Sequence, residues 1–486
     1  MQALTVIGII VEIVILFNFM ILVHELGHYL AARWRGLQID KFQIWFGKPI
    51  WSKTIDGVQW GMGWIPAGGF VALPQMAPME MLEGQSTNAK PMEPIKPIDK
   101  IIVAFAGPLF SFTLALFFAF VVWGVKRPIS ASAATTTIGY ISEEAVQGAE
   151  QLQLGDKILE VDGRPVDSWS GMVDSVAWNT ISSGGDTVPV KVQREGVVDP
   201  IIVALAAPDF EAAAENDKSS FIGKFFKRPE LRRIEGMGVF PEVRPMVAKL
   251  FPNSPAEKSG LKPNDIIVQA NGQEVMSRAV IGQMIKEAPD NPLDLVVERA
   301  GQEQSIQVTA QLPTNAETLE IENPMLGIQW DLTGETTLQR TPPFLQIKHA
   351  CLTMYNTLAA VFSPNSSISA KHLSGPVGIM RVYYLLFEDK DGWRRALWFS
   401  VILNINLAIL NMMPLPVLDG GHIVMSLVES VRKRPISKRL LELSYGGCAI
   451  FLIGFMIFIT GFDVKDIFGG SGGGSAIERV DPIFQP

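Results

Sequence analysis

Long apolar runs alternate with polar stretches along this chain, and four of the runs approach the thickness of a bilayer. A helix needs about 20 mostly apolar residues to cross the hydrocarbon layer. The runs cover residues 4–23, 101–123, 396–413 and 446–462. Within the second run, Gly107-Pro108 predicts a kink or a helix start. The pattern therefore predicts four transmembrane helices, which we assign to residues 1–35, 98–126, 393–430 and 438–465.

The long stretch between the second and third predicted spans has a β-strand pattern and an internal repeat. "LGDKILEVDGRPV" from Leu154 and "PNDIIVQANGQEV" from Pro263 share an Asp, an apolar run, an Asp-Gly or Asn-Gly pair and a short strand. Such pairs between apolar runs are signals of tight turns. Asp156 and Asp265 are 109 positions apart, which is a domain-sized spacing. The order of elements resembles PDZ domains, which we assign to residues 129–212 and 237–313, with a polar linker at 213–236.

Three further segments lie outside the predicted spans and repeats. Residues 36–97 contain a strand-like stretch with glycines and with Trp45, Trp51, Trp60 and Trp64. Because tryptophan favours the membrane interface, this stretch predicts a β-hairpin that dips into the interface. If the hairpin reaches membrane depth, protein or a wet cavity must shield its backbone. Residues 314–392 predict an extracytoplasmic connecting region with amphipathic helices. The glycine-rich stretch 469–486 predicts a flexible linker and an appended tag.

Composition agrees with a membrane protein and excludes some partners. Hydrophobic residues make up 48% of the 486 residues and charged residues only 19%, with a mean hydropathy of +0.23, so a lipid bilayer is expected as the surroundings. The net charge of −8 leaves no basic footprint for a nucleic acid. Cys351 and Cys448 lie in different segments, which excludes a disulfide framework and a cysteine zinc site.

Lysine and arginine orient the predicted spans. They gather in the loop between the first two spans and in the short loop before the fourth. Since positive loops stay on the cytoplasmic side, both loops are predicted to be cytoplasmic. The N-terminus and residues 126–392 are then predicted on the opposite side.

The motif His24-Glu25-Leu26-Gly27-His28 closes the first apolar run and carries the candidate chemistry. Histidines at i and i+4 share one helix face, so both imidazoles can reach one tetrahedral zinc. Glu25 lies to one side of this pair, in a position to take a proton from water. The chain has only five histidines, and two of them fall in this motif, which argues against a chance match.

A catalytic zinc needs a third protein ligand, and the third apolar run ends in "NMMPLPVLDGGH". Asp419 is one candidate, because a carboxylate at membrane depth is energetically costly and therefore indicates a functional site. Its alternative role is an ordinary helix N-cap. His422 is the rival ligand, and the residue pattern alone does not separate the two. Asn411 lies near the end of the third run, beside the helix break, in a position to donate a hydrogen bond to a developing oxyanion. For Asn404, an amide that holds helices together is an equally good interpretation.

These motifs together resemble the site-2 protease family of intramembrane zinc metalloproteases, peptidase family M50. The resemblance rests on the histidine motif, on "AGPL" from Ala106 and on "NMMPLPVLDGG" from Asn411. The two PDZ-like domains, "IPAGGFV" from Ile65 and "LSGPVGI" from Leu373 are similar to the bacterial regulator-of-sigma-E type. The likeness extends to about Phe468. It implies a polytopic α-helical membrane protein with four transmembrane helices, a membrane-reentrant β-loop and two extracytoplasmic PDZ domains.

The resemblance also implies residue roles. One Zn²⁺ per chain is expected on His24, His28 and Asp419, which favours Asp419 over His422. Glu25 and Asn411 are the expected catalytic residues. The expected substrate contacts are Gly68, Gly69, Phe70 and Asn406, with the β-loop pairing with an unwound substrate.

The expected activity is a zinc endopeptidase of the bacterial inner membrane, with its active site toward the cytoplasm and its PDZ domains in the periplasm. Its expected substrates are single-span membrane proteins, namely anti-sigma factors and remnant signal peptides. The PDZ domains are expected to admit substrates that have already been trimmed, although their grooves could instead bind a C-terminal carboxylate. Two alternatives remain: a membrane PDZ receptor with a dead site, and a metal transporter.

Overall fold

The computed structural model describes residues 2–76, 95–143, 145–207, 234–316, 321–331, 334–363, 370–388, 391–434, 436–468 and 481–485, with the single positions 319, 366 and 368. The chain divides into two compact units. The first unit comprises residues 1–127, 340–354 and 374–463, and the second comprises 128–339, 355–373 and 464–486.

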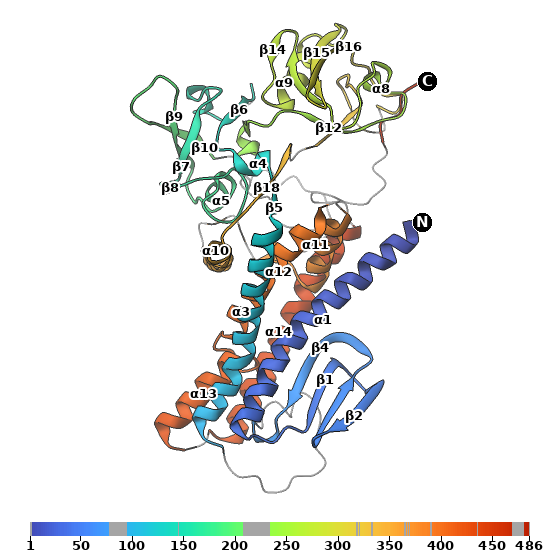
Figure 1. Ribbon diagram of the computed structural model, residues 1–486. Coiled ribbons are helices and arrows are strands. Elements are labelled where there is room, and N and C mark those ends of the chain that lie inside the picture. Colours follow the sequence, from blue (N-terminus) through green and yellow to red (C-terminus); the bar gives the residue numbers. More distant parts are fainter. Residues whose placement is uncertain are drawn as a thin grey trace. The chain divides into compact units, whose positions relative to one another are not determined.

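The first unit is mainly helical (Figure 1). Its elements are α1 (Gln2–Arg35), β1 (Lys41–Phe46), β2 (Trp51–Ile55), β3 (Val58–Met62), β4 (Ile65–Ala72), the 3-10 helix η1 (Pro74–Met76), α3 (Pro97–Val125), the first part of α10 (Pro343–Phe362), α11 (Pro376–Glu388), α12 (Gly392–Asn411), α13 (Asp419–Arg432) and most of α14 (Lys438–Phe468).

Three helices in the described part of the chain are long and apolar enough to cross a membrane: Val6–Arg35, Pro97–Val125 and Arg439–Lys465. They correspond to the first, second and fourth predicted spans. The third predicted span is divided between α12 and α13, with a break at 412–418, and α12 does not meet the same criterion. The total of four spans therefore stays a prediction.

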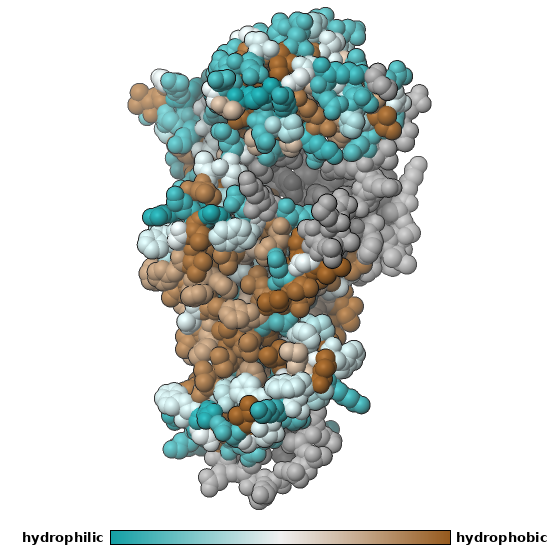
Figure 2. Space-filling view, turned by 45° about the vertical axis from the view of Figure 1, so that its right-hand side comes forward, coloured by the Kyte–Doolittle hydropathy of each residue, from teal (hydrophilic) through white to brown (hydrophobic). Residues whose placement is uncertain are grey.

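Apolar side chains lie on the outside of these helices, as brown areas in Figure 2 illustrate. Exposed large apolar residues recur along all three candidate spans; examples are Ile7, Ile15, Phe112, Phe117, Ile450 and Phe451. A surface of this kind is unfavourable in water and favourable against lipid tails. The helical unit is thus built for an apolar surrounding.

The first cytoplasmic loop of the prediction forms a four-stranded sheet with the strand order β2-β3-β1-β4. β2 and β3 form a hairpin, β1 runs parallel to β3, and β4 pairs antiparallel with β1. β4 therefore lies at one edge of the sheet. Because an edge strand has backbone groups without a strand partner on its outer side, β4 can accept another strand there.

The helices α1 and α3 approach closely near the histidine motif. A Cβ added at Gly27 of α1 would lie 2.5 Å from the carbonyl oxygen of Ala106 on α3. Only glycine allows this separation, so the "AGPL" segment can lie directly against the motif. Buried residues of both helices and of the sheet, among them Tyr29, Phe42 and Val103, form one apolar cluster around this crossing.

The second unit is rich in β structure (Figure 1). Most of its elements are β5 (Arg127–Ser130), α4 (Ala131–Ala134), β6 (Ile138–Ile141), η2 (Ala149–Gln151), β7 (Lys157–Val161), β8 (Arg164–Pro165), α5 (Val176–Ile181), β9 (Thr187–Gln193), β10 (Ile201–Ala206), η3 (Glu235–Met237), β11 (Val239–Pro241), β12 (Met246–Leu250), α8 (Pro255–Lys258), β13 (Ile266–Ala270), β14 (Gln273–Glu274), α9 (Arg278–Glu287), β15 (Leu293–Arg299), β16 (Gln302–Val308), β17 (Ile328–Asp331), β18 (Thr336–Gln339) and η4 (Ala370–His372).

The two copies of the sequence repeat have the same order of secondary-structure elements. The hairpins β7–β8 and β13–β14 are each followed by a helix and by a second hairpin, β9–β10 or β15–β16. Both short hairpins turn at the predicted pairs, Asp162-Gly163 and Asn271-Gly272, with positive φ at all four residues, as a type I′ turn requires. The strand orders are β10-β9-β7-β8 and β16-β15-β13-β12-β17, with β14 on β13.

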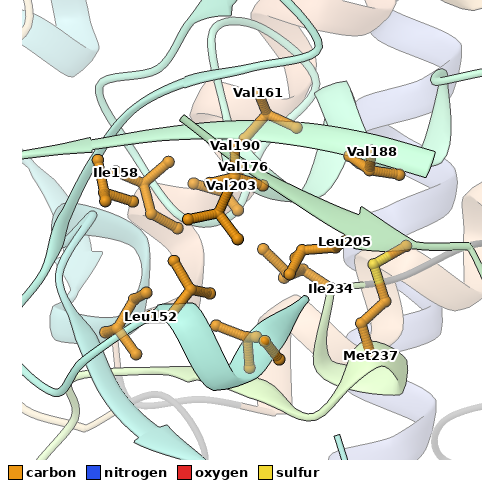
Figure 3. Close-up of a cluster of buried hydrophobic side chains, with 14 of the residues drawn as sticks. Leu152, Ile158, Val161, Val176, Val188, Val190, Val203, Leu205, Ile234 and Met237 are labelled. Carbon is orange, nitrogen blue, oxygen red and sulfur yellow. The ribbon is translucent and has the colours of Figure 1, made fainter. Parts of the chain in front are cut away.

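Each repeat has its own apolar core. Figure 3 shows the core of the first, where Ile158, Val190 and Leu205 point toward one another from neighbouring elements. This core also contains Met237, and β11 pairs with β6, so the first repeat extends past the predicted start of the second at residue 237. In the second repeat, β17 pairs with β12 beyond the predicted end at residue 313. The strands β11 and β17 are only three and four residues long, and each pairs with a strand that is far away in the sequence.

The repeated aspartates have the same role in the two repeats. Asp156 accepts two hydrogen bonds from Arg194, both of 2.8 Å, and Asp265 accepts two from Arg299, of 2.7 and 2.6 Å. Both carboxylates are buried. The hydrogen bonds raise the pKa of each guanidinium. Each pair joins the start of one strand to a strand beside it, and so closes its sheet with a bidentate contact.

Two predicted segments fall wholly or mainly outside the described residues. The structure leaves residues 213–233 of the predicted linker, residues 208–212 at the end of the first predicted PDZ domain and residues 469–480 of the predicted tail undescribed. Residues 481–485, in contrast, are packed against the second unit, with Phe484 buried.

Candidate metal centre

The structure brings three predicted ligand residues to one point. Nε2 of His24 lies 3.3 Å from Oδ2 of Asp419, and Nε2 of His28 lies 3.4 Å from Oδ1 of the same carboxylate. The two Nε2 atoms are 3.3 Å apart. Among the described residues, these three form a group of side chains that could hold a metal ion, with their ligand atoms all within 4.8 Å.

Helix α3 orients both imidazole rings. Nδ1 of His24 lies 2.9 Å from the hydroxyl of buried Ser111, and Nδ1 of His28 donates to the carbonyl of Val103 at 2.8 Å. Between these two partners, a Cβ added at Gly107 would lie 2.2 Å from Nε2 of His28. Val103, Gly107 and Ser111 are spaced by four residues, so they form one stripe of α3 that faces the two histidines.

The donor set fits zinc. Because Nδ1 of His28 donates its hydrogen to Val103, Nε2 of a neutral ring carries a lone pair and points at the cluster. Nε2 of His24 and a carboxylate face the same point. Oδ2 of Asp419 is buried and has no hydrogen-bond partner among the described residues. Two imidazole nitrogens and a carboxylate are a ligand set of catalytic zinc, and the convergence of these three side chains on one point suits a cation.

A break in the chain after α12 positions Asp419. Pro414 and Pro416 lie in the stretch 412–418, which folds back onto the start of α13. A Cβ at Gly420 would lie 2.2 Å from the carbonyl oxygen of Met412, and one at Gly421 would lie 2.1 Å from that of Leu415. The two glycines therefore allow the close turn that brings Asp419, the first residue of α13, to the histidines.

A cavity of about 230 Å³ opens beside the three ligands. Its lining residues are Ile21, His24, Glu25, His28, Gly68, Gly69, Phe70, Leu407, Asn411, Val417, Leu418 and Asp419. The carboxylate of Glu25 accepts a hydrogen bond from the backbone of Val71 in β4, and Nδ2 of Asn411 lies 3.3 Å from Nε2 of His24. The cavity thus combines the candidate ligands, a carboxylate outside the ligand group, an amide and the edge strand.

Not every predicted site residue reaches this cavity. Gly68, Gly69 and Phe70 line it, whereas Asn406 does not, and the buried Oδ1 of Asn406 has no partner among the described residues. Asn404 donates to the carbonyl of Ser400 in its own helix. His422, the rival ligand, lies 3.2 Å from the hydroxyl of Tyr445 through its Nδ1 and outside the three-ligand group.

The sequence interpretation did not single out Ser111, Val103 or the role of Gly107. A signal was present, since a serine and a glycine four positions apart are conspicuous in the apolar run 101–123. Small and polar residues at helical spacing mark a helix face that packs closely against another.

The family model described as "Peptidase family M50" matches residues 12–455 of this chain. The chain belongs to peptidase family M50. Similar M50 relatives span nearly the whole chain. A protein of Pasteurella multocida (strain Pm70), provisionally named a zinc metalloprotease, is 29% identical over 473 residues, covering 92% of this chain and 96% of its own length. A provisionally named zinc metalloprotease of Neisseria meningitidis is 26% identical, covering 93% and 98%.

The chain is also similar to the regulator of sigma-E protease RseP of Escherichia coli (strain K12). The two are 26% identical over 452 residues, covering 90% of this chain and 94% of the relative. Membership of the M50 family and these relatives identify the protein as a zinc metalloprotease, and its apolar helices are those of a membrane protein.

Proposed function

We propose that the protein is an intramembrane endopeptidase that cleaves single-span membrane proteins. One observation carries the proposal: two of the three candidate ligands, His24 and His28, lie on α1, a helix that has an exposed apolar surface and is long enough for a bilayer. A hydrolytic site on such a helix is suited to a substrate that is itself in the membrane.

His24, His28 and Asp419 would hold one zinc ion per chain. When bound, zinc supplies Lewis-acid activation of water and of the scissile carbonyl. Glu25 lines the same cavity without belonging to the ligand group, and acts as the general base that takes the proton of the attacking water and passes it to the leaving amine. Asn411 donates a hydrogen bond to the oxygen on which negative charge develops.

The edge strand β4 would bind the substrate backbone. A transmembrane helix keeps its scissile amides within its own hydrogen bonds, so it must unwind before cleavage. β4 is supported in this role by its place at the sheet edge and by Gly68, Gly69 and Phe70, which line the cavity. An unwound segment that pairs with β4 exchanges lost helix bonds for strand bonds. Asn406 does not line the cavity, and its proposed contact with substrate rests on the family resemblance alone.

The likeness to regulators of sigma-E protease supports anti-sigma factors and remnant signal peptides as substrates. We assign the protein to the bacterial inner membrane with four spans, the active site toward the cytoplasm and the two β repeats, as PDZ domains, in the periplasm. There they would admit substrates that have already been trimmed. A membrane receptor with a dead site and a metal transporter are the competing functions. The carboxylate of Glu25 in the cavity disfavours the receptor. The transporter is disfavoured because the described residues contain a single cluster of possible metal ligands and a large β-rich unit.

A cleavage assay with a single-span model substrate tests the proposal. Glu25→Gln removes the general base and keeps the side-chain shape, so cleavage should fall by at least about 10²-fold while bound zinc is kept. Glu12→Gln is the matched control, because Glu12 is an exposed glutamate of the same helix. Equal cleavage by the wild type and by Glu25→Gln would contradict the mechanism. A wild type that binds zinc and cuts nothing would favour the receptor.

A further inference from the structure

The residues Asp481–Gln485, which we call the docked segment, are held by the second unit through a set of contacts that the proposed protease function does not use. Their partners come from α8, from the stretch after β16 and from the stretch before β17. All of these residues belong to the second unit. The docked segment therefore occupies a site within one compact body.

Most polar contacts at this site are made to the backbone of the docked segment. The carbonyl of Ile483 accepts from the backbone N–H of Thr314 at 2.7 Å and from its hydroxyl at 2.9 Å. Asn315 makes a pair of bonds: its Oδ1 accepts from the N–H of Ile483 at 2.9 Å, and its Nδ2 donates to the carbonyl of Asp481 at 3.0 Å. Lys258 donates from Nζ to the carbonyl of Gln485 at 2.7 Å. Contacts of this kind recognise a peptide chain with little regard to its side chains.

One side chain of the docked segment is the anchor. Phe484 is only 4% exposed, whereas the neighbouring Ile483 is 57% exposed. A Cβ added at Gly327, a residue with φ of +74°, would lie 2.9 Å from Cε2 of Phe484. The absence of a side chain at Gly327 thus makes room for the ring. Buried aromatic residues with exposed neighbours are typical anchors of peptide recognition.

We propose that this surface is a peptide-binding site that takes segments with a single aromatic anchor, and that the docked segment is its resident ligand. A backbone clamp formed by Thr314, Asn315 and Lys258 holds the chain of the ligand, and the space over Gly327 accepts the aromatic ring. A second peptide of the same chemistry has to displace the resident one. The site is consequently self-occupied, and its apparent affinity for other peptides is reduced by the fraction of time that the docked segment is bound.

Fluorescence anisotropy of a labelled peptide with the sequence of residues 476–486 tests this on the full-length protein in detergent. Phe484→Ala removes the anchor of the resident segment, so the labelled peptide should bind this variant at least about tenfold more tightly than the wild type. Ile483→Ala is the matched control, because its side chain is exposed; it should bind the peptide as weakly as the wild type. A labelled peptide that itself carries the change Phe484→Ala should not bind.

Two further variants keep the test decisive. Asn315→Ala added to Phe484→Ala should remove the gained binding, because the clamp loses both bonds of the amide. A chain that ends at Phe468 should bind the labelled peptide as tightly as Phe484→Ala does. Equal binding to the wild type and to Phe484→Ala, or no binding to either, would overturn the proposal. Neither outcome bears on cleavage, which the Glu25→Gln assay measures separately.

Discussion

Replacing Gly107 by alanine should disable the metal centre and leave the fold intact. The new Cβ would lie 2.2 Å from Nε2 and 2.5 Å from Cε1 of His28, and 2.8 Å from Nε2 of His24. Since carbon and nitrogen are comfortable at roughly 3.5 Å, the ring of His28 must move by about 1 Å. A displacement of about 1 Å costs about 10²-fold in rate. Loss of the orienting contact to Val103 costs a further factor of about 10–100 in metal affinity.

The assay compares cleavage of a single-span substrate and zinc content of the purified protein. Gly124→Ala is the matched control, since it lies in the same helix and its added Cβ meets no heavy atom within 4 Å. Alanine favours a helix over glycine by about 1 kcal/mol. This gain offsets part of the overpacking cost of about 1–3 kcal/mol expected for Gly107→Ala, so that variant should stay folded. If Gly107→Ala keeps the zinc and the activity of Gly124→Ala, the close contact between α3 and the histidines has no bearing on the metal site.

The remaining predictions concern three carboxylates. Asp419→Ala should lose most of the bound zinc and most of the cleavage activity, because only two ligands, His24 and His28, remain. His422→Ala should keep its zinc. The reverse result in metal analysis would make His422 the third ligand. Asp463→Ala should lower stability by roughly 1–3 kcal/mol, because this buried carboxylate of α14 accepts from two backbone N–H groups at the start of α11 at 2.8 and 3.0 Å, and alanine leaves both without an acceptor; an unchanged thermal midpoint in detergent would refute the role of these two hydrogen bonds. Asp265→Asn should destabilise the second repeat, because it removes the buried negative charge that pairs with Arg299; hydrogen exchange of β13 and β15 should speed up, with zinc content unchanged, and equal exchange rates would argue against the pair.

The two candidate histidine ligands were predictable from the residues alone because their spacing is local, whereas the choice of Asp419 over His422 came from the family resemblance. His24 and His28 are four residues apart on one helix, and Asp419 follows two prolines at the end of an apolar run. Both the residue spacing and the energetic cost of a carboxylate at membrane depth can be recognised in a single sequence. The structure brings the three side chains to one point, and their binding of a metal stays a prediction.

The partners of the histidines were harder to predict, because they depend on how two helices cross. Nothing within α1 indicates that Ser111 lies next to His24, or that the carbonyl of Val103 accepts from His28. The same holds for the sheets. β1 pairs in parallel with β3, and β17 pairs with β12 from about 80 positions further along the chain. A pattern of period two predicts a strand but does not predict which strand lies beside it.

The edge position of β4 has a consequence for how such a protease selects among membrane proteins. Pairing through main-chain groups is nearly blind to side chains, so the strand offers similar bonds to almost any segment that reaches it. Discrimination then moves to the cost of freeing that segment from its helix. Glycine and β-branched residues lower this cost relative to alanine or leucine. Substrate choice at this site would accordingly be a measure of helix fragility, and two sequences without a shared motif would be cut at similar rates when they unwind with similar ease.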